Sequence, residues 1–196
     1  MIQSLIILDN FYQDVDSVRQ FALSQEYNVT GNYPGRRTVP LGSESAKKVI
    51  ADVLRPVNGE ITVWDTGDDS YNGSFQYTTK HDKSWIHDDK YTTWAAVCYL
   101  TPNAPVNSGT ALFTHKATGL NKTPYKQNGD VDFELLNEIY KDSQDMSKWN
   151  LNVQVSNVYN RLVMYRGYYF HTSLEYFGND LNDGRLFQTF FFSTEY

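Results

Sequence analysis

The segment TTWAAVCYLT, residues 92–101, is an apolar run that stops at Pro102. Short apolar runs bounded by turn residues are typical of buried strands rather than of helices, which need more residues. We therefore predict a buried strand over these residues, and the fold class follows from the pattern on either side of it.

Strand patterns continue on both sides of this segment. Downstream they cover GTALFTHK (109–116), NLNVQVSN (150–157), RLVMYRGYYFHTS (161–173) and RLFQTFFFSTEY (185–196). Upstream, ITVWDT (61–66) and SFQYTTK (74–80) flank Asn72–Gly73, a dipeptide that favours a tight hairpin turn. Short strands at this spacing predict a mainly β protein with paired sheets, a sandwich or jelly roll.

Helical patterns precede and interrupt the strands. After a short apolar strand over residues 2–8, helices are expected over 14–25 and 43–54, separated by a turn-rich loop over 28–40. Asp14 or Asp16 caps the first helix, and Asp132 caps a later one, FELLNEIYKD, which follows a polar loop over 117–130. We expect the N-terminal helices to form a layer that covers one sheet.

The composition is that of one folded domain. The 196 residues are 40% hydrophobic and 15% aromatic, and no repeat or linker divides them. We predict a single domain over 1–196, with a helical support region over 1–56 and a jelly-roll core over 57–196 that carries an insertion over 116–149.

The charge and the cysteine content restrict the partners and the compartment. A net charge of −6 disfavours a broad surface for nucleic acid or anionic membrane, which needs clustered Lys and Arg. Cys98 is the only cysteine, so no intrachain disulfide forms, which suits a reducing compartment. The N-terminus resembles a strand more than a signal peptide or membrane span. We expect a cytoplasmic protein, and its oligomeric state stays open.

The chemistry-bearing pattern is His87-Asp88-Asp89, just before the buried strand. On an extended segment, positions i and i+2 project to the same side, so His87 and Asp89 converge on one ion while Asp88 points away. His171, at the end of a later strand pattern, completes two imidazoles and one carboxylate, the facial set of non-haem iron(II) oxygenases. The alternative is a surface histidine beside solvated acids.

Arg185 opens the last strand pattern and shares a face with Phe187, by strand alternation. A guanidinium among bulky apolar side chains indicates a bound anion, and its paired donors suit a carboxylate such as that of 2-oxoglutarate. The alternative is that Arg185 lies at the wet end of the strand and pairs with Asp183.

Together these motifs resemble a known group. The order H-x-D, an aliphatic strand ending in Tyr-Leu, G-T-x-x-F, Phe-His and a strand-borne Arg resembles the 2-oxoglutarate/iron(II) oxygenase superfamily. Within it the chain is most similar to prolyl-4-hydroxylase-like enzymes and to small phage and bacterial members. The likeness covers residues 70–115 and 158–192 and extends to IILDNFYQDVDSVRQFAL and YPGRRT near the N-terminus.

The resemblance implies a double-stranded β-helix (jelly roll, cupin-like) and a dioxygenase that consumes O2 and 2-oxoglutarate. It makes His87, Asp89 and His171 ligands of Fe(II), Arg185 the anchor of 2-oxoglutarate, and Tyr99 a second hydrogen-bond donor to it. For Tyr99 a core aromatic is the alternative. Hydroxylation of a peptide side chain or small metabolite, with release of succinate and CO2, is the expected reaction. If the chain is phage-encoded, it acts in the host cytoplasm.

The sequence departs from the resemblance at two points. Prolyl hydroxylases have a lysine where this chain has Arg185, and residues 116–149 have no clear counterpart. Both leave the substrate open. Two other functions also remain: a zinc hydrolase with the same ligands, and a non-catalytic β-sandwich binding or structural module. His81 and His115 have no assigned role, and Arg36 and Arg37 are expected to be an exposed, solvated pair.

Overall fold

A computed structural model describes residues 4–58, 60–67 and 70–195. The elements run in the order β1 (Leu5–Leu8), α1 (Val15–Leu23), β2 (Arg36–Arg37), α2 (Glu44–Asn58), β3 (Ile61–Val63), β4 (Phe75–Thr78), β5 (Trp94–Tyr99), β6 (Thr110–His115), α3 (Phe133–Tyr140), the 3-10 helix η1 (Met146–Lys148), β7 (Trp149–Val155), β8 (Leu162–Arg166), β9 (His171–Ser173) and β10 (Arg185–Thr194).

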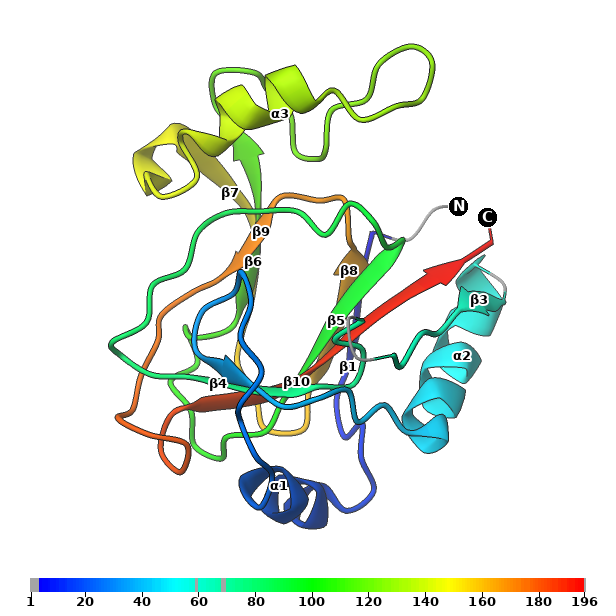
Figure 1. Ribbon diagram of the computed structural model, residues 1–196, viewed down its shortest axis with the longest axis vertical. Helices are drawn as coiled ribbons and strands as arrows, with labels where there is room; N and C mark the ends of the chain where they lie inside the picture. Colours follow the sequence, from blue (N-terminus) through cyan, green and yellow to red (C-terminus); the bar gives the residue numbers. More distant parts are fainter. Residues whose placement is uncertain (1–3, 59, 68–69, 196) are drawn as a thin grey trace.

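The strands form two antiparallel sheets (Figure 1). The larger sheet has the order β1-β8-β5-β10-β4-β2, with β3 also paired to β10, and the smaller has the order β7-β6-β9. Strands that are distant in the sequence are therefore neighbours in both sheets. This is the predicted mainly β fold with flanking helices, a double-stranded β-helix.

The central strands of the larger sheet are buried on both faces, which explains their continuous apolar sequences. On β5, Trp94 and Ala96 pack with the helices, whereas Val97 and Tyr99 pack between the two sheets. β10 alternates in the same way, and its Phe187 lies between the sheets. The TTWAAVCYLT prediction is confirmed, because β5 is buried along its whole length.

The N-terminal helices cover one face of the larger sheet, as predicted (Figure 1). Asp14 caps α1 by accepting a hydrogen bond from the Ser17 amide at 3.0 Å. Ile50 and Leu54 of α2 are fully buried against the sheet. α2 is longer than expected. It continues to Asn58, and Pro56 lies within its last turn instead of ending the helix at residue 54.

Two local predictions were wrong. Asn72–Gly73 does not join a hairpin: β3 and β4 do not pair with each other but with different parts of β10. The long β10 provides partners for both, and the Asn72 side chain accepts a hydrogen bond from the Phe191 amide at 3.1 Å. The pattern over 161–173 is also not one strand. It breaks after Arg166, so that β8 joins the larger sheet and β9 the smaller.

The segment over 116–149 packs closely on the smaller sheet. Leu136 and Ile139 of α3 are buried against Trp149 and Phe170. Figure 1 shows α3 at the end of the molecule remote from α1. Among the described residues, no helix is both long and apolar enough to cross a membrane.

Candidate active site

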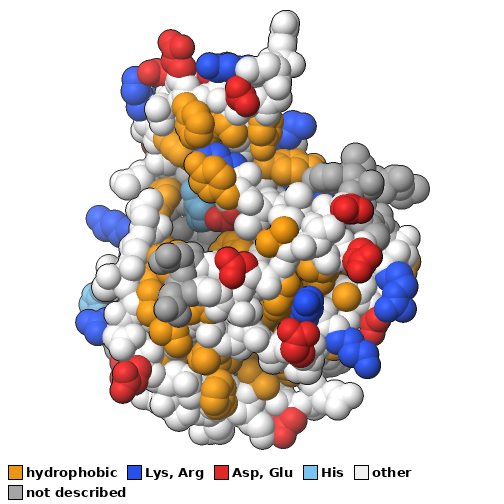
Figure 2. Space-filling model, turned by 45° about the vertical axis from the view of Figure 1, so that its right-hand side comes forward, with side chains coloured by type: hydrophobic (Ala, Val, Ile, Leu, Met, Phe, Trp, Pro, Cys, Tyr) orange, Lys and Arg blue, Asp and Glu red, His pale blue; other side chains and the backbone are white. Residues whose placement is uncertain are grey.

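A cavity of about 450 Å³ lies between the two sheets. Figure 2 shows a hollow on this face of the molecule, with histidine and acidic side chains inside it. Its apolar walls include Val97, Tyr165, Phe187 and Phe191 from the larger sheet, and its polar lining includes Tyr33, Arg37, Tyr71, Gln76, His87, Asp89, Thr110, His171, Ser173 and Thr189.

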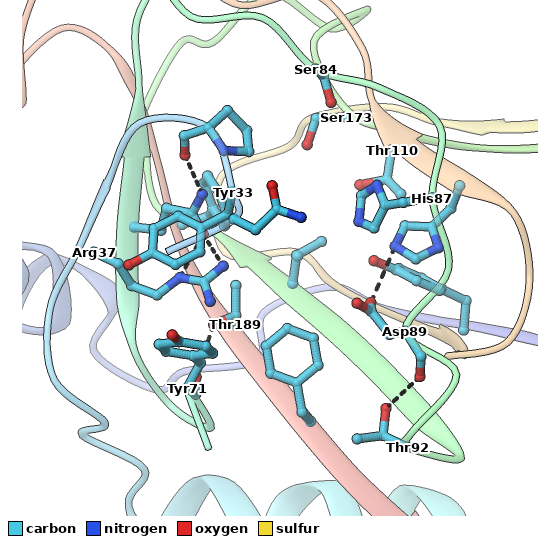
Figure 3. A pocket seen from close by; sticks show the side chains of 18 of the residues that line it. Tyr33, Arg37, Tyr71, Ser84, His87, Asp89, Thr92, Thr110, Ser173 and Thr189 are labelled. Carbon is cyan, nitrogen blue, oxygen red and sulfur yellow. Dashed lines mark hydrogen bonds and ion pairs between the residues drawn. The ribbon is translucent and has the colours of Figure 1, made fainter. Parts of the chain in front are cut away.

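The three predicted ligand residues meet in this cavity, and Figure 3 labels two of them, His87 and Asp89. One ligand atom from each of His87, Asp89 and His171 lies within 4.8 Å of the others. The two histidines face each other across an antiparallel bridge in which His87 N donates to His171 O at 3.0 Å and His171 N donates to His87 O at 2.8 Å. The bridge sets their ring centroids 4.4 Å apart.

Both imidazoles are oriented by a carbonyl two residues earlier. His87 Nδ1 lies 3.0 Å from Trp85 O, and His171 Nδ1 lies 2.7 Å from Tyr169 O. Because a carbonyl only accepts, each Nδ1 carries the proton and donates it. In a neutral ring the Nε2 lone pair is then free to bind a metal, the usual way that a second hydrogen bond prepares a histidine ligand.

Asp89 is held mainly through its backbone. Its amide donates to Gly167 O at 2.7 Å, its carbonyl accepts from Thr92 N at 3.0 Å, and its Oδ2 lies 3.2 Å from His171 Nε2. Asp88 points away, as expected, and accepts from Thr123 Oγ1 at 2.8 Å. Only the second acid of the H-x-D motif therefore faces the cavity.

The pKa values follow from burial and from mutual charge. Burial lowers the pKa of His87, and the neighbouring His171 lowers it further. Burial acts in the same direction on His171, but the hydrogen bond and charge of Asp89 outweigh it and raise the pKa of His171. For Asp89, burial favours the neutral acid, but the two histidines and Arg37 outweigh it and lower its pKa. The cluster thus keeps an anionic carboxylate ready to bind a cation.

Arg185 is fully buried on β10 and does not pair with Asp183, which accepts hydrogen bonds from Asn179 and Asp180 instead. Its Nε donates to Ser108 O at 2.9 Å. Within the described residues, Nη1 and Nη2 have no hydrogen-bond partner. The guanidinium lies 4.4 Å from the centre of the Phe187 ring. A buried cation with two unused donors fits a bound carboxylate.

Tyr99 is also fully buried, and its hydroxyl donates to Thr110 Oγ1 at 2.8 Å. Its ring centre lies 5.3 Å from the Arg185 guanidinium, and burial raises the pKa of its hydroxyl. Thr110 lines the cavity, whereas Tyr99 lies behind it. The link between Tyr99 and the cavity runs through Thr110, a residue that the sequence pattern did not single out.

Arg37 was wrongly expected to be solvent-exposed. Only 6% of it is accessible, and it lines the cavity, whereas Arg36 is exposed. The two side chains of β2 point to opposite sides of the strand, because successive residues of a strand alternate in direction.

Of the unassigned histidines, His81 is exposed, and His115 is buried with its Nε2 3.0 Å from Asp142 Oδ2. Neither lines the cavity.

Solved structures that are similar to this fold include alpha ketoglutarate (2-oxoglutarate) dependent enzymes. HygX from Streptomyces hygroscopicus, with nickel and 2-oxoglutarate bound, has 12% identity and a TM-score of 0.58 over 95% of this chain and 81% of HygX. SnoK, a non-heme alpha ketoglutarate dependent carbocyclase, has 12% identity and a TM-score of 0.55 over 97% of this chain and 80% of its own. For the epimerase SnoN the values are 13%, 0.54, 95% and 76%.

Two sequence comparisons complete this picture. Residues 2–192 match the family described as "Family of unknown function (DUF6445)". No curated protein matches the sequence. The structural similarities to HygX, SnoK and SnoN confirm the resemblance to 2-oxoglutarate/iron(II) oxygenases at the level of the fold.

Proposed function

The chain belongs to the DUF6445 family. From the geometry of its site, we propose that it is a non-haem Fe(II) and 2-oxoglutarate-dependent dioxygenase. One observation carries the proposal. The His87–Asp89–His171 cluster lines the cavity between the sheets, and the buried Arg185, with two unused donors, lies 4.4 Å from the ring centre of Phe187, which lines the same cavity. A metal hydrolase needs the first feature but not the second.

Each part of this chain has a defined task in the proposed enzyme. His87 and His171 present Nε2, and Asp89 an anionic oxygen, to Fe(II). The Nη1 and Nη2 donors of Arg185 bind the distal carboxylate of 2-oxoglutarate through two parallel hydrogen bonds. When bound, the metal and cosubstrate supply oxygen activation, with 2-oxoglutarate converted to succinate and CO2.

The cavity walls protect this chemistry from water. Val97, Phe187 and Phe191 present apolar surface beside the metal cluster. Excluding water strengthens the attraction between Arg185 and a carboxylate, because fewer solvent dipoles screen it. Tyr99 holds Thr110 through its hydroxyl proton. In our proposal this single proton turns from Thr110 Oγ1 to 2-oxoglutarate when the cosubstrate binds.

The substrate is proposed to be a small molecule or a peptide segment that enters the hollow seen in Figure 2. One structure of HygX contains hygromycin B together with nickel and 2-oxoglutarate. A protein of similar fold therefore binds a small molecule together with a metal and 2-oxoglutarate, and this supports the proposal for the present chain.

Anaerobic addition of Fe(II) and then 2-oxoglutarate tests the proposal. We expect a visible charge-transfer band, which His171→Ala abolishes and the exposed-histidine control His81→Ala retains. Arg185→Met should need about a hundredfold more 2-oxoglutarate to develop the band, because it loses a charge-assisted pair worth roughly 2–4 kcal/mol. Absence of the band, together with absence of succinate release in air, would reject the oxygenase and leave the zinc hydrolase or the binding module.

A further inference from the structure

A second buried arginine faces the cavity and is not used by the proposed mechanism. Arg37 Nε donates to Gln76 Oε1 at 2.9 Å, and its Nη2 donates to the same oxygen. The Gln76 amide in turn donates to Pro34 O at 2.6 Å, which fixes the direction of Oε1. Among the residues that the structure describes, Nη1 of Arg37 has no hydrogen-bond partner.

Two tyrosines hold the guanidinium in a corner. The Arg37 Cζ atom lies 3.8 Å from the Tyr33 ring centre and 4.8 Å from that of Tyr71. The two rings meet edge to face at 75°, with their centres 5.5 Å apart. Both rings attract the cation through their π faces but supply no negative charge. The corner therefore fixes the position of the guanidinium and leaves its net charge unbalanced.

No carboxylate of the described residues forms an ion pair with this arginine. Within the described part of the chain, no acidic oxygen lies within 4.0 Å of the Arg37 guanidinium, although the charge of Asp89 is felt across the cavity. Burial lowers the pKa of Arg37 to about 10, so the side chain still carries its proton at neutral pH. Buried charges in proteins are normally paired. An unpaired cation that lines a cavity indicates that its partner is a ligand.

Arg37 and the metal cluster lie on opposite sides of the cavity. Figure 3 shows Arg37 with Tyr33 and Tyr71 on one side, facing His87 and Asp89 on the other. A molecule held at Arg37 therefore places its remaining part towards the metal ligands. Arg185 is not among the residues that line the cavity. Its unused donors can serve the cosubstrate while Arg37 serves a different molecule.

We propose that Arg37 is the substrate-recognition residue of this site and binds a carboxylate of the oxidised substrate. The inference rests on the proposed function. A carboxylate fits better than a phosphate because Gln76 already occupies Nε and one Nη2 hydrogen, which leaves a single edge for a planar, singly charged partner. Arg37 is also the only Lys or Arg among the described residues that line the cavity. The apolar wall of Phe187 and Phe191 would contact the rest of the substrate.

Fluorine NMR with matched probes tests the inference on the full chain loaded with Ni(II) and 2-oxoglutarate. The probes are para-fluorophenylacetate, its neutral amide para-fluorophenylacetamide, and para-fluorophenyl phosphate. We expect the acid to bind about tenfold or more tightly than the amide and more tightly than the phosphate, because only the acid supplies a planar anion. Equal binding of acid and amide, or preference for the phosphate, would overturn the carboxylate assignment.

Substitutions at Arg37 and Arg36 test whether the acid probe binds at Arg37. Arg37→Gln should weaken the acid about tenfold or more and leave the amide unchanged, whereas the matched control Arg36→Gln, altered at the exposed neighbour, should bind both probes as the original chain does. Arg37→Lys keeps the charge but loses the planar fork, so it should bind the acid with intermediate affinity. Acid binding that survives in Arg37→Gln would refute the inference.

Two readouts separate the possible failures. If Fe(II) and 2-oxoglutarate give no charge-transfer band with the unaltered chain, the proposed function fails. If the band forms but excess 2-oxoglutarate displaces the acid, the acid occupies the cosubstrate position and only the Arg37 inference fails. Should Arg37→Gln not fold, Arg37→Lys and the comparison of acid with amide on the unaltered chain still decide the question.

Discussion

Two imidazoles with opposite pKa shifts face each other in the candidate metal centre. His171 has its pKa raised by Asp89, whereas His87 has its pKa lowered by burial and by His171. In the absence of metal, His171 is therefore the ring that takes up a second proton, on Nε2, at the higher pH. A metal ion must displace that proton before it binds Nε2, so protons and metal compete at one named atom.

This competition predicts the pH dependence of metal binding. Because the pKa of His171 lies above the ordinary value of 6.5, Ni(II) affinity should begin to fall above that pH as the solution is acidified. Below the raised pKa it should fall about tenfold per pH unit for the one proton displaced. Calorimetric Ni(II) titrations from about pH 5.5 to about pH 8.5 measure this. A flat profile across that range would contradict the assignment of His171 as the protonated ligand.

At the scale of elements, the turn between β8 and β9 positions the ligand loop, residues 87–92, which carries His87 and Asp89. Gly167 lies in this turn, and a Cβ built on it would be 2.6 Å from Thr92 O and 2.7 Å from Asp89 O, both backbone atoms. The same glycine accepts a hydrogen bond from the Asp89 amide through its carbonyl. Close approach of two backbones thus holds the carboxylate ligand opposite the histidine bridge.

We therefore expect Gly167→Ala to displace Asp89. The added methyl group must push the ligand loop away, which should destabilise the protein by about 1–3 kcal/mol and weaken Ni(II) binding as well. Gly67→Ala is a suitable control, because the nearest atom to its Cβ is a flexible side-chain oxygen of Asp65 at 3.2 Å. Urea unfolding and Ni(II) titration measure the two effects. Unchanged metal affinity in Gly167→Ala would show that this contact does not position Asp89.

At the scale of the whole molecule, the candidate metal centre joins the two sheets. His171 begins β9 of the smaller sheet, whereas Asp89 is held against the turn that follows β8 of the larger sheet. A bound ion would add a link between these layers, and unfolding would break it. Binding to the folded state alone also raises stability by mass action.

Metal should accordingly raise the melting temperature. At a Ni(II) concentration of about a hundred times Kd the gain is about 2.7 kcal/mol. For a chain of this size that corresponds to a rise of roughly 5–10 °C. Asp89→Asn should lose most of the rise, and His81→Ala should retain it. Thermal unfolding followed by circular dichroism measures the shift. An equal shift in Asp89→Asn would place the ion elsewhere.

Local patterns accounted for most of the elements. The apolar run of β5 and the Asp14 cap of α1 are visible in short windows, because strand burial and helix capping depend on neighbouring residues. The Asn72–Gly73 hairpin and the single strand over 161–173 were wrong because the choice of strand partner depends on β10 and on the two-sheet arrangement, which no short window contains.

The features of the candidate site were likewise predictable from the sequence only where they depend on neighbouring residues. The i, i+2 spacing of His87 and Asp89 was sufficient to predict that both side chains point to the same side, since that geometry belongs to an extended backbone. Whether His171 lies opposite His87, whether Arg185 lacks a partner, and whether Arg37 is buried depend on contacts between residues far apart in the chain. Those contacts exist only after the sheets have packed, because packing removes solvent and brings distant strands together.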